Sequence, residues 1–162
     1  MHIALAETDQ VVARCHPVMV QLRPHLADAN EFVAQVKRQF AEGFRLAYVE
    51  DGGAVVAAAG FRVQEMLAHG RLLYVDDLVS DAARRSHGYG AALMAWLIAY
   101  ASEQGCVSLQ LDSGVQRYDA HRFYFTQRMH IASYHFALRG EVFAQRAHHA
   151  AAGSSTSAST GR

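Results

Sequence analysis

The spacing of apolar residues along the chain changes several times, and each change marks a predicted element. Residues 9–43 follow a helical period that breaks near Pro24, which predicts two helices. Asp28 or Asn30 is the expected N-cap of the second helix, and Gly43 is its expected end. The apolar positions of this helix lie at helical spacing: Phe32, Val33, Val36 and Phe40.

The pattern between residues 44 and 80 is typical of strands. The run RLAYVEDGGAVVAAAGFRVQEML predicts a hairpin that turns at its Asp-Gly-Gly, and RLLYVDDLV predicts a further strand. Residues 2–6 alternate weakly and predict a short first strand. A hairpin in this position favours antiparallel neighbours over a doubly wound parallel sheet.

The second half of the chain alternates between helix and strand. Residues 90–103 predict an amphipathic helix, and CVSLQLD predicts a strand because its apolar residues occupy every second position. Asp119 begins a last helix that is expected to run to Met129, and IASYHFAL is expected to close the fold as a strand. The predicted class is therefore mixed α/β (α+β), in the order β-α-α-β-β-β-α-β-α-β.

Composition narrows the range of functions. The 162 residues carry fifteen basic and fifteen acidic side chains, so no net charge favours a nucleic acid partner. The longest apolar run, residues 91–101, is too short to span a bilayer, and the first residues, MHIALAETD, do not follow the pattern of a secretion signal. Cys15 and Cys106 are distant in sequence and are expected as reduced thiols of a cytoplasmic protein. One domain over residues 1–145 is expected, followed by a disordered Ala/Ser/Thr/Gly tail at residues 150–162.

The segment RRSHGYGAAL, which joins a strand to a helix, is the main candidate for chemistry. Gly88 and Gly90 supply two glycines of a dinucleotide fingerprint, but Leu93 stands where the third belongs. A pyrophosphate cradle is the alternative, because unpaired N–H groups at a helix N-terminus attract anions and Arg84 and Arg85 add positive charge. A flexible helix entrance with surface arginines is equally compatible with the spacing.

The wider segment LLYVDDLVSDAARRSHGYGAALMAWL resembles the acetyl-CoA-binding segment of the GNAT superfamily of N-acetyltransferases. The family signature is Arg/Gln-x-x-Gly-x-Gly/Ala, and residues 85–90 match it fully. The family's Ala-x-x-Phe/Leu-Tyr on the last core helix is matched by residues 120–124, AHRFY. The resemblance implies a GNAT-type central mixed, mostly antiparallel sheet with helices on both faces.

The resemblance also implies acetyl-CoA as co-substrate and implies no metal. The pantetheine arm is expected to pair with backbone groups of Leu78, Val79 and Ser80 at the end of the strand. The pyrophosphate is expected on the amides of the loop and first helical turn: Arg85, Ser86, His87, Gly88, Tyr89, Gly90 and Ala91.

Transfer of an acetyl group to an amine requires a neutral nucleophile and a protonated or hydrogen-bonded leaving thiolate. An alkylamine has a pKa of about 10, so only about one molecule in a thousand is neutral at pH 7. Tyr124 matches the family position that protonates the leaving thiolate or donates a hydrogen bond to it. Because proton transfer from a tyrosine to a thiolate runs uphill by about 2 kcal/mol, Tyr124 is expected to act first as a hydrogen-bond donor.

Asp76 and Asp77 are the candidate acids for the amine, because two carboxylates inside an apolar strand are costly unless they are paired or functional. Polyamine acetyltransferases of the superfamily carry a Glu-Asp pair in the same place. Strand geometry predicts that the two acids point to opposite faces and cannot share one role. A structural ion pair with Arg71 or Arg122 is the alternative role, and Asp112 is a further candidate acid.

The function expected from these features is direct transfer of acetyl from acetyl-CoA to a primary amine of a small molecule. A protein-lysine or N-terminal acetyltransferase and a non-catalytic acyl-CoA-binding module remain alternatives. No nucleic acid or membrane partner is expected, and a homodimer is left open. The roles of Arg117 and Arg128 also stay open between contact with CoA phosphates or an anionic part of the acceptor and solvated surface charge.

Overall fold

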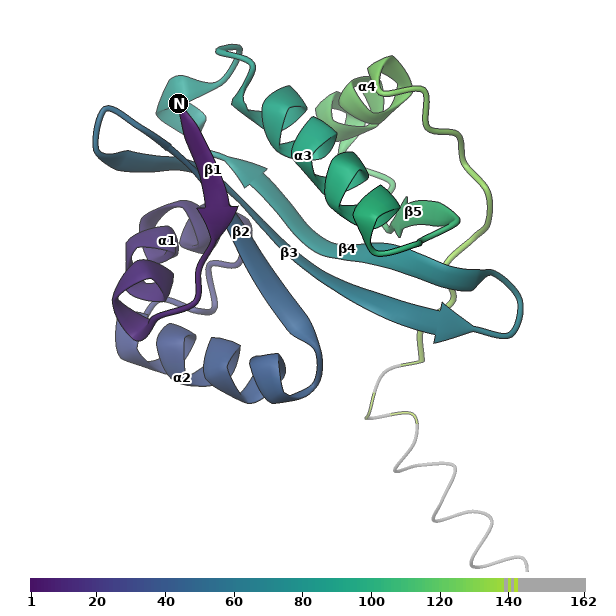
Figure 1. The fold of residues 1–162 in the computed structure, drawn as a ribbon, viewed down its shortest axis with the longest axis horizontal. Coiled ribbons are helices and arrows are strands. Elements are labelled where there is room, and N and C mark those ends of the chain that lie inside the picture. The colour runs from purple at the N-terminus through teal and green to yellow at the C-terminus, as the bar shows by residue number, and fades with distance from the viewer. Residues whose placement is uncertain (139, 141, 143–162) are drawn as a thin grey trace, which may run out of the picture. The chain divides into compact units, whose positions relative to one another are not determined.

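The computed structural model describes residues 1–138, 140 and 142 (Figure 1). The elements follow in the order β1 (His2–Leu5), α1 (Asp9–Leu22), α2 (Ala29–Ala41), β2 (Phe44–Asp51), β3 (Ala54–Met66), β4 (Gly70–Ser80), a 3-10 turn (Ala82–Arg84), α3 (Tyr89–Glu103), β5 (Ser108–Leu111) and α4 (Tyr118–Thr126). No helix in this part of the chain is both long and apolar enough to cross a bilayer. The chain divides into residues 1–127 and a second unit from Arg128 onward.

The five strands form one sheet in the order β1-β2-β3-β4-β5. The first four are antiparallel to their neighbours, whereas β5 runs parallel to β4 and pairs only with residues Leu72 to Val75. The expected mixed α/β class with a mostly antiparallel sheet is confirmed. Beyond Val75, β4 continues along β3 without β5 beside it, so one edge of β4 is left without a neighbouring strand.

Helices cover both faces of the sheet, and each face has its own apolar core. On one face, α1 and α2 bury Val12, Cys15 and Phe32 against β2 and β3. On the other face, α3 buries Leu93 and Leu97 against the opposite sides of the same strands. Each fully buried side chain of this size contributes about 1.5–3 kcal/mol relative to an exposed one, so the two cores hold the strands in register.

Side chains at the ends of the first two helices fix how the chain enters them. Thr8 caps α1, and Asp28 caps α2 by accepting a hydrogen bond from the Glu31 amide at 2.8 Å. Gly43, at φ +87°, follows the end of α2, a backbone conformation that glycine adopts without steric cost. Of the two expected caps for α2, the structure therefore uses Asp28.

A one-residue bulge in β4 changes which side chains face α1 and α2. Val75 is opposite Phe61 and Asp77 is opposite Gly60, so Asp76 is the extra residue. Before the bulge Val75 packs on the α3 side, and after it Leu78 packs on that side as well. Asp76 and Asp77, between them, both line the cavity on the α1–α2 face.

The expected last strand is wrong. Residues 131–138 form no strand in the structure, and α4 ends at Thr126 rather than Met129. Alternating apolar residues favour an extended chain, but a strand also requires a neighbour for its backbone hydrogen bonds, and none of the described strands pairs with this segment. Its large apolar side chains are exposed: Ile131, Tyr134, Phe136 and Leu138. The expected tail at residues 150–162 lies outside the described residues.

Gly60 is expected to be irreplaceable because it leaves room for the Phe44 ring. A Cβ at position 60 would lie 2.4 Å from Phe44 Cζ and 3.1 Å from Asp77 Oδ2. We predict that Gly60→Ala lowers the free energy of unfolding by about 1–3 kcal/mol, because the added methyl group clashes with the Phe44 ring. This clash outweighs the roughly 0.5–1 kcal/mol by which alanine, with its less flexible backbone, would otherwise stabilise the fold.

Urea unfolding of a double-mutant cycle with Phe44→Leu checks this cause. The cost of Gly60→Ala should fall in the Phe44→Leu background, because the smaller side chain vacates the contact. An equal cost in both backgrounds would show that the ring is not responsible.

Candidate active site

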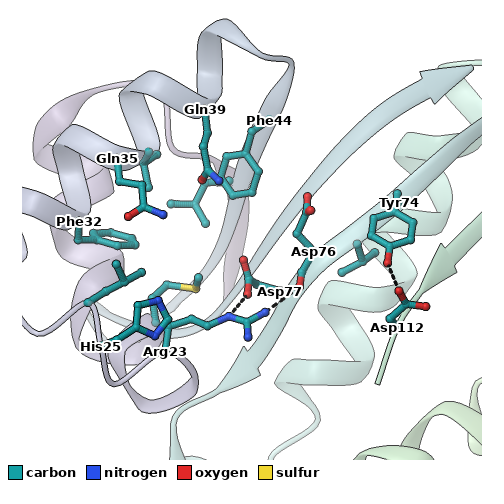
Figure 2. Close-up of a pocket in the computed structure, with 15 residues that line it drawn as sticks. Arg23, His25, Phe32, Gln35, Gln39, Phe44, Tyr74, Asp76, Asp77 and Asp112 are labelled. Carbon is teal, nitrogen blue, oxygen red and sulfur yellow. Dashed lines mark hydrogen bonds and ion pairs between the residues drawn. The ribbon is translucent and has the colours of Figure 1, made fainter. Parts of the chain in front are cut away.

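A cavity of about 480 Å³ lies on the α1–α2 face of the sheet (Figure 2). Helices α1 and α2 and their connection form one wall, and β2, β4 and the residue after β5 form the other. Its apolar surface is contributed by Met19, Leu26, Phe32, Val36, Phe44 and Leu46. Three acids also line it: Asp76, Asp77 and Asp112.

The bulge brings Asp76 and Asp77 to the same cavity. The expectation that they point to opposite faces is therefore wrong, because strict alternation fails where one strand carries an extra residue. The two carboxylates nevertheless diverge within the cavity: Asp77 points toward Arg23, and Asp76 points away from it (Figure 2).

Each of these acids is paired with an arginine. Arg23 Nε donates to Asp77 Oδ1 at 2.7 Å, and its Nη2 donates to the Asp76 carbonyl oxygen at 3.3 Å. Arg62 Nε, on β3, donates to Asp76 Oδ2 at 3.0 Å, and the Arg62 guanidinium lies 5.5 Å from the centroid of the Phe44 ring. A cation over an aromatic ring is favourable, so Phe44 helps to hold Arg62 in this position.

The expected partners of the acids, Arg71 and Arg122, are wrong. Arg71 Nε donates to the carbonyl oxygen of Gln104, at the end of α3. Arg122 lies 3.8 Å from Asp119 on the exposed surface of α4. Arg71 and Arg122 lie near the two motifs in sequence, whereas the partners Arg23 and Arg62 reach the acids only in the folded structure.

Asp76 has a perturbed environment. Burial raises the pKa of Asp76, with a smaller contribution from the charge of Asp77, and the hydrogen bond and charge of Arg62 oppose this rise without cancelling it. A carboxylate whose pKa is raised binds a proton more readily, which suits a group that must accept one from an ammonium.

Asp112 lies at the end of β5 and closes the cavity on that side. It accepts a hydrogen bond of 2.6 Å from the Tyr74 hydroxyl, as Figure 2 shows. Burial, together with this bond to the carboxylate, raises the pKa of Tyr74, so the Tyr74 hydroxyl keeps its proton at neutral pH.

A second cavity, of about 230 Å³, opens where β4 and β5 cease to pair. Tyr124 from α4 lines it together with Leu78, Leu111 and Arg117. Burial raises the pKa of Tyr124, and the positive charge of Arg117 opposes this shift. The hydroxyl of Tyr124 is therefore neutral and able to donate a hydrogen bond into the cavity.

The two cavities share part of their walls. The residues common to both are Arg23, Val75, Asp76, Asp77 and Asp112. The acids thus stand between a larger cavity of mixed polar and apolar lining and a smaller one that contains Tyr124. This arrangement can bring two reactants together, one from each cavity.

The glycine-containing segment forms a cradle of backbone amides before α3. Gly88, at φ +82°, is the N-cap of α3 and has no side chain that could cap the first N–H groups of this helix. Ser86 also has a positive φ of 64°, which is uncommon for a residue with a side chain. A Cβ at Gly90 would lie 3.3 Å from Ser80 Oγ, so glycine permits close packing of the helix against the end of β4.

The side chains of the loop have structural contacts of their own. His87 Nδ1 donates to the carbonyl oxygen of Arg85 at 2.8 Å, and its ring stacks on that of Tyr89. The Tyr89 hydroxyl donates to Asp51 at 2.6 Å, a bond that lowers the pKa of Asp51 together with the Met1 ammonium. The start of α3 is thereby tied to the β2–β3 turn.

Several residues of the site were not expected from the sequence. They are Arg23, Arg62, Tyr74 and the pocket-lining side chains of α2, Gln35 and Gln39. None of these residues lies in a motif. The helical spacing of Phe32 and Val36 predicts only that this face of α2 packs against the core. Within residues 1–138, 140 and 142, no three His, Cys, Asp or Glu side chains gather as metal ligands.

Comparisons with known proteins identify relatives of this chain. The model of the Acetyltransferase (GNAT) family matches residues 8–130. An uncharacterized N-acetyltransferase, YhdJ of Bacillus subtilis (strain 168), is 32% identical over 125 residues, which cover 76% of this chain and 87% of YhdJ.

Solved structures show the same fold. The ribosomal-protein-alanine N-acetyltransferase of Brucella melitensis biovar Abortus 2308 superposes with a TM-score of 0.75 at 16% identity, covering 86% of this chain and 99% of its own. The aminoglycoside N-acetyltransferase AAC(6')-Iy, solved in complex with CoA, has a TM-score of 0.72 at 11% identity, covering 85% of this chain and 94% of its own.

The environment of Asp76 gives a prediction about its titration. We expect carboxyl NMR to show a pKa for Asp76 above its ordinary value of 3.8, and Arg62→Met to raise the pKa further, because the guanidinium favours the carboxylate. Arg38→Met, which removes only an exposed pair with Glu31, is the matched control and should leave the titration of Asp76 unchanged.

The sign of the linked stability change follows from the direction of this shift. Because the folded state holds the Asp76 proton more tightly than the unfolded chain does, this group's contribution to stability is present at low pH. It is lost as pH rises through the folded-state pKa. A downward shift of the Asp76 pKa in Arg62→Met would contradict the assigned cause.

Proposed function

The chain belongs to the GNAT acetyltransferase family, and from that premise we propose that it moves an acetyl group from acetyl-CoA to a primary amine of a small molecule, directly and in a ternary complex. The observation that carries the proposal is the meeting of two cavities at Asp76, Asp77 and Asp112. One cavity contains Tyr124 and is suited to the thioester. The other has a mixed polar and apolar lining and a limited volume, which favours a small acceptor.

Acetyl-CoA is proposed to bind along the part of β4 that β5 leaves uncovered. Backbone groups of Leu78, Val79 and Ser80 would pair with the pantetheine arm, as a further strand would. The pyrophosphate would lie on the amides of residues 85–91, where the glycine N-cap and the uncapped helix N-terminus favour an anion.

The amine must lose a proton before or as it attacks. Its nitrogen forms a bond to the thioester carbonyl carbon, the C–S bond breaks, and the sulfur leaves as thiolate. Asp76 is proposed to accept the proton of the incoming ammonium, directly or through a water, because its pKa is raised and it stands between the two cavities. Asp77, held by Arg23, is proposed to attract and orient the same ammonium.

Tyr124 is proposed to stabilise the departing thiolate. Its neutral hydroxyl, kept protonated by burial, donates a hydrogen bond to the thiolate as charge develops. A donor that acts mainly in the transition state affects turnover more than cofactor affinity.

A cytoplasmic location is also proposed, because Cys15 and Cys106 are free thiols.

The role of Tyr124 predicts a selective loss of turnover. Tyr124→Phe is expected to lower kcat by roughly 10²-fold or more, the range for one lost acid or oxyanion donor, while the Kd for CoA changes by less than about threefold. CoA-thiol release with an amine panel and calorimetric titration of CoA measure the two effects.

Tyr118→Phe is the matched control, because it removes the same hydroxyl from the same helix at an exposed position. Unchanged turnover in Tyr124→Phe would remove Tyr124 from the mechanism. Tight CoA binding without turnover on any amine would instead favour a non-catalytic acyl-CoA-binding module.

The backbone cradle predicts an effect on CoA affinity. Gly88→Ala places a side chain at φ +82°, which strains the backbone by about 1–2 kcal/mol, and we expect it to weaken CoA binding as well as to destabilise the fold. Gly105→Ala is the control, because Gly105 has φ +69° and open surroundings just beyond the other end of the same helix.

Both variants should lower the midpoint of thermal unfolding by comparable amounts. Only Gly88→Ala should raise the Kd for CoA, by roughly tenfold, since one decade corresponds to about 1.4 kcal/mol. Equal CoA affinity in the two variants would place the pyrophosphate elsewhere.

A further inference from the structure

The charged side chains of the larger cavity are concentrated at one end. All three acids come from β4 and the end of β5, and their neighbours Arg23 and His25 come from the end of α1 and the connection to α2. The wall contributed by α2 contains no charged side chain: Phe32, Gln35, Val36 and Gln39. The cavity therefore favours an ammonium at one end only.

Apolar and aromatic side chains also line the cavity. Phe44 and Leu46 from β2 and Phe32 from α2 are almost completely buried, with 1–2% of their surface exposed, so the few atoms that reach the cavity are held by the core behind them. Phe44 also stacks on Phe40 at a centroid distance of 6.3 Å. A flat apolar body placed here would be stabilised by the removal of its surface from water, and contacts with the aromatic edges would add to this.

Two amides stand at the end away from the acids. Gln35 and Gln39 are four residues apart, so they share one face of α2 and extend toward the cavity (Figure 2). Neither side chain makes a hydrogen bond to another residue in the described part of the chain. Both are half-buried, so a hydroxyl or carbonyl group of a ligand would find donors and acceptors there.

From these three features we propose that the acceptor is an amphipathic monoamine: one primary amine, an aromatic body, and a hydroxyl or carbonyl group at the far end. This inference rests on the proposed acetyl transfer. A diamine of the same length would place its second ammonium against α2, where no carboxylate compensates its desolvation. Gln35 and Gln39 are thus specificity residues for the neutral polar group.

Three matched amines test the proposal with acetyl-CoA and the full chain: tyramine, phenethylamine and 4-(aminomethyl)phenethylamine. They share the aminoethyl-benzene body and differ at the far end in a hydroxyl, a hydrogen or a second ammonium. The kcat/KM for tyramine is expected to exceed that for the diamine by about tenfold or more, with phenethylamine between them. Turnover of the diamine as fast as tyramine overturns the inference.

A charge variant tests where the selection occurs. Gln39→Glu places a carboxylate on the α2 wall and should shift the tyramine-to-diamine ratio by about tenfold toward the diamine. Gln10→Glu makes the same change at an exposed position of α1 and should leave the ratio as in the wild type. An unchanged ratio in Gln39→Glu overturns the assignment of the α2 wall, and thermal unfolding of each variant confirms that it is folded.

The possible failures are distinguishable. Acetylation of a peptide amine or a polyamine in preference to tyramine refutes the acceptor class and leaves acetyl transfer intact. Absence of CoA release with every amine, although CoA binds, refutes the proposed function and this inference with it.

Discussion

Strand β4 carries one residue more than β3 between Val75 and Asp77, and the arrangement of the site follows from that bulge. In a regular strand, Asp76 and Asp77 would lie on opposite faces, and one of them would enter the apolar core beneath α3. With the bulge, both reach the cavity on the α1–α2 face, while Val75 and Leu78 keep their places in the core on the other side. Gly60 on β3 leaves the space in which Phe44 and Asp77 meet.

The acids are tolerated because each is paired across the sheet. An isolated carboxylate in a half-buried position costs several kcal/mol, and removing one member of a buried pair costs more than the pair contributes when intact. The side chain of Asp77 is only 14% exposed, and Arg23 reaches it from the end of α1. Arg62 forms an ion pair with Asp76 from the adjacent strand, and its guanidinium lies over the Phe44 ring. The helices, the sheet and the larger cavity are thus coupled through two guanidinium groups.

Local patterns in the sequence located the glycine loop and Tyr124, whereas the arginines and glutamines around the acids could not be located from such patterns. The glycines at 88 and 90 are needed for local backbone reasons, and Tyr124 follows from a short spacing on one helix, so both can be recognised in a few residues. The order of helices and strands could also be predicted for most of the chain, because the helical and alternating spacings of apolar residues are local features of the sequence. Arg23, Arg62, Gln35 and Gln39 become neighbours of the acids only through long-range packing. The bulge depends on the register of two strands, and the wrongly expected strand at residues 131–138 shows that alternation alone does not provide a pairing partner.

In the proposed reaction, a thioester and an amine approach each other from two cavities that meet at the acids of β4. A crystal structure of the protein with CoA would reveal whether they do. We expect pantetheine along Leu78, Val79 and Ser80, the pyrophosphate on the amides before α3, and the thiol in the smaller cavity within hydrogen-bonding distance of the Tyr124 hydroxyl. A thiol that lies away from Tyr124, or a pantetheine arm bound at another edge of the sheet, would contradict it.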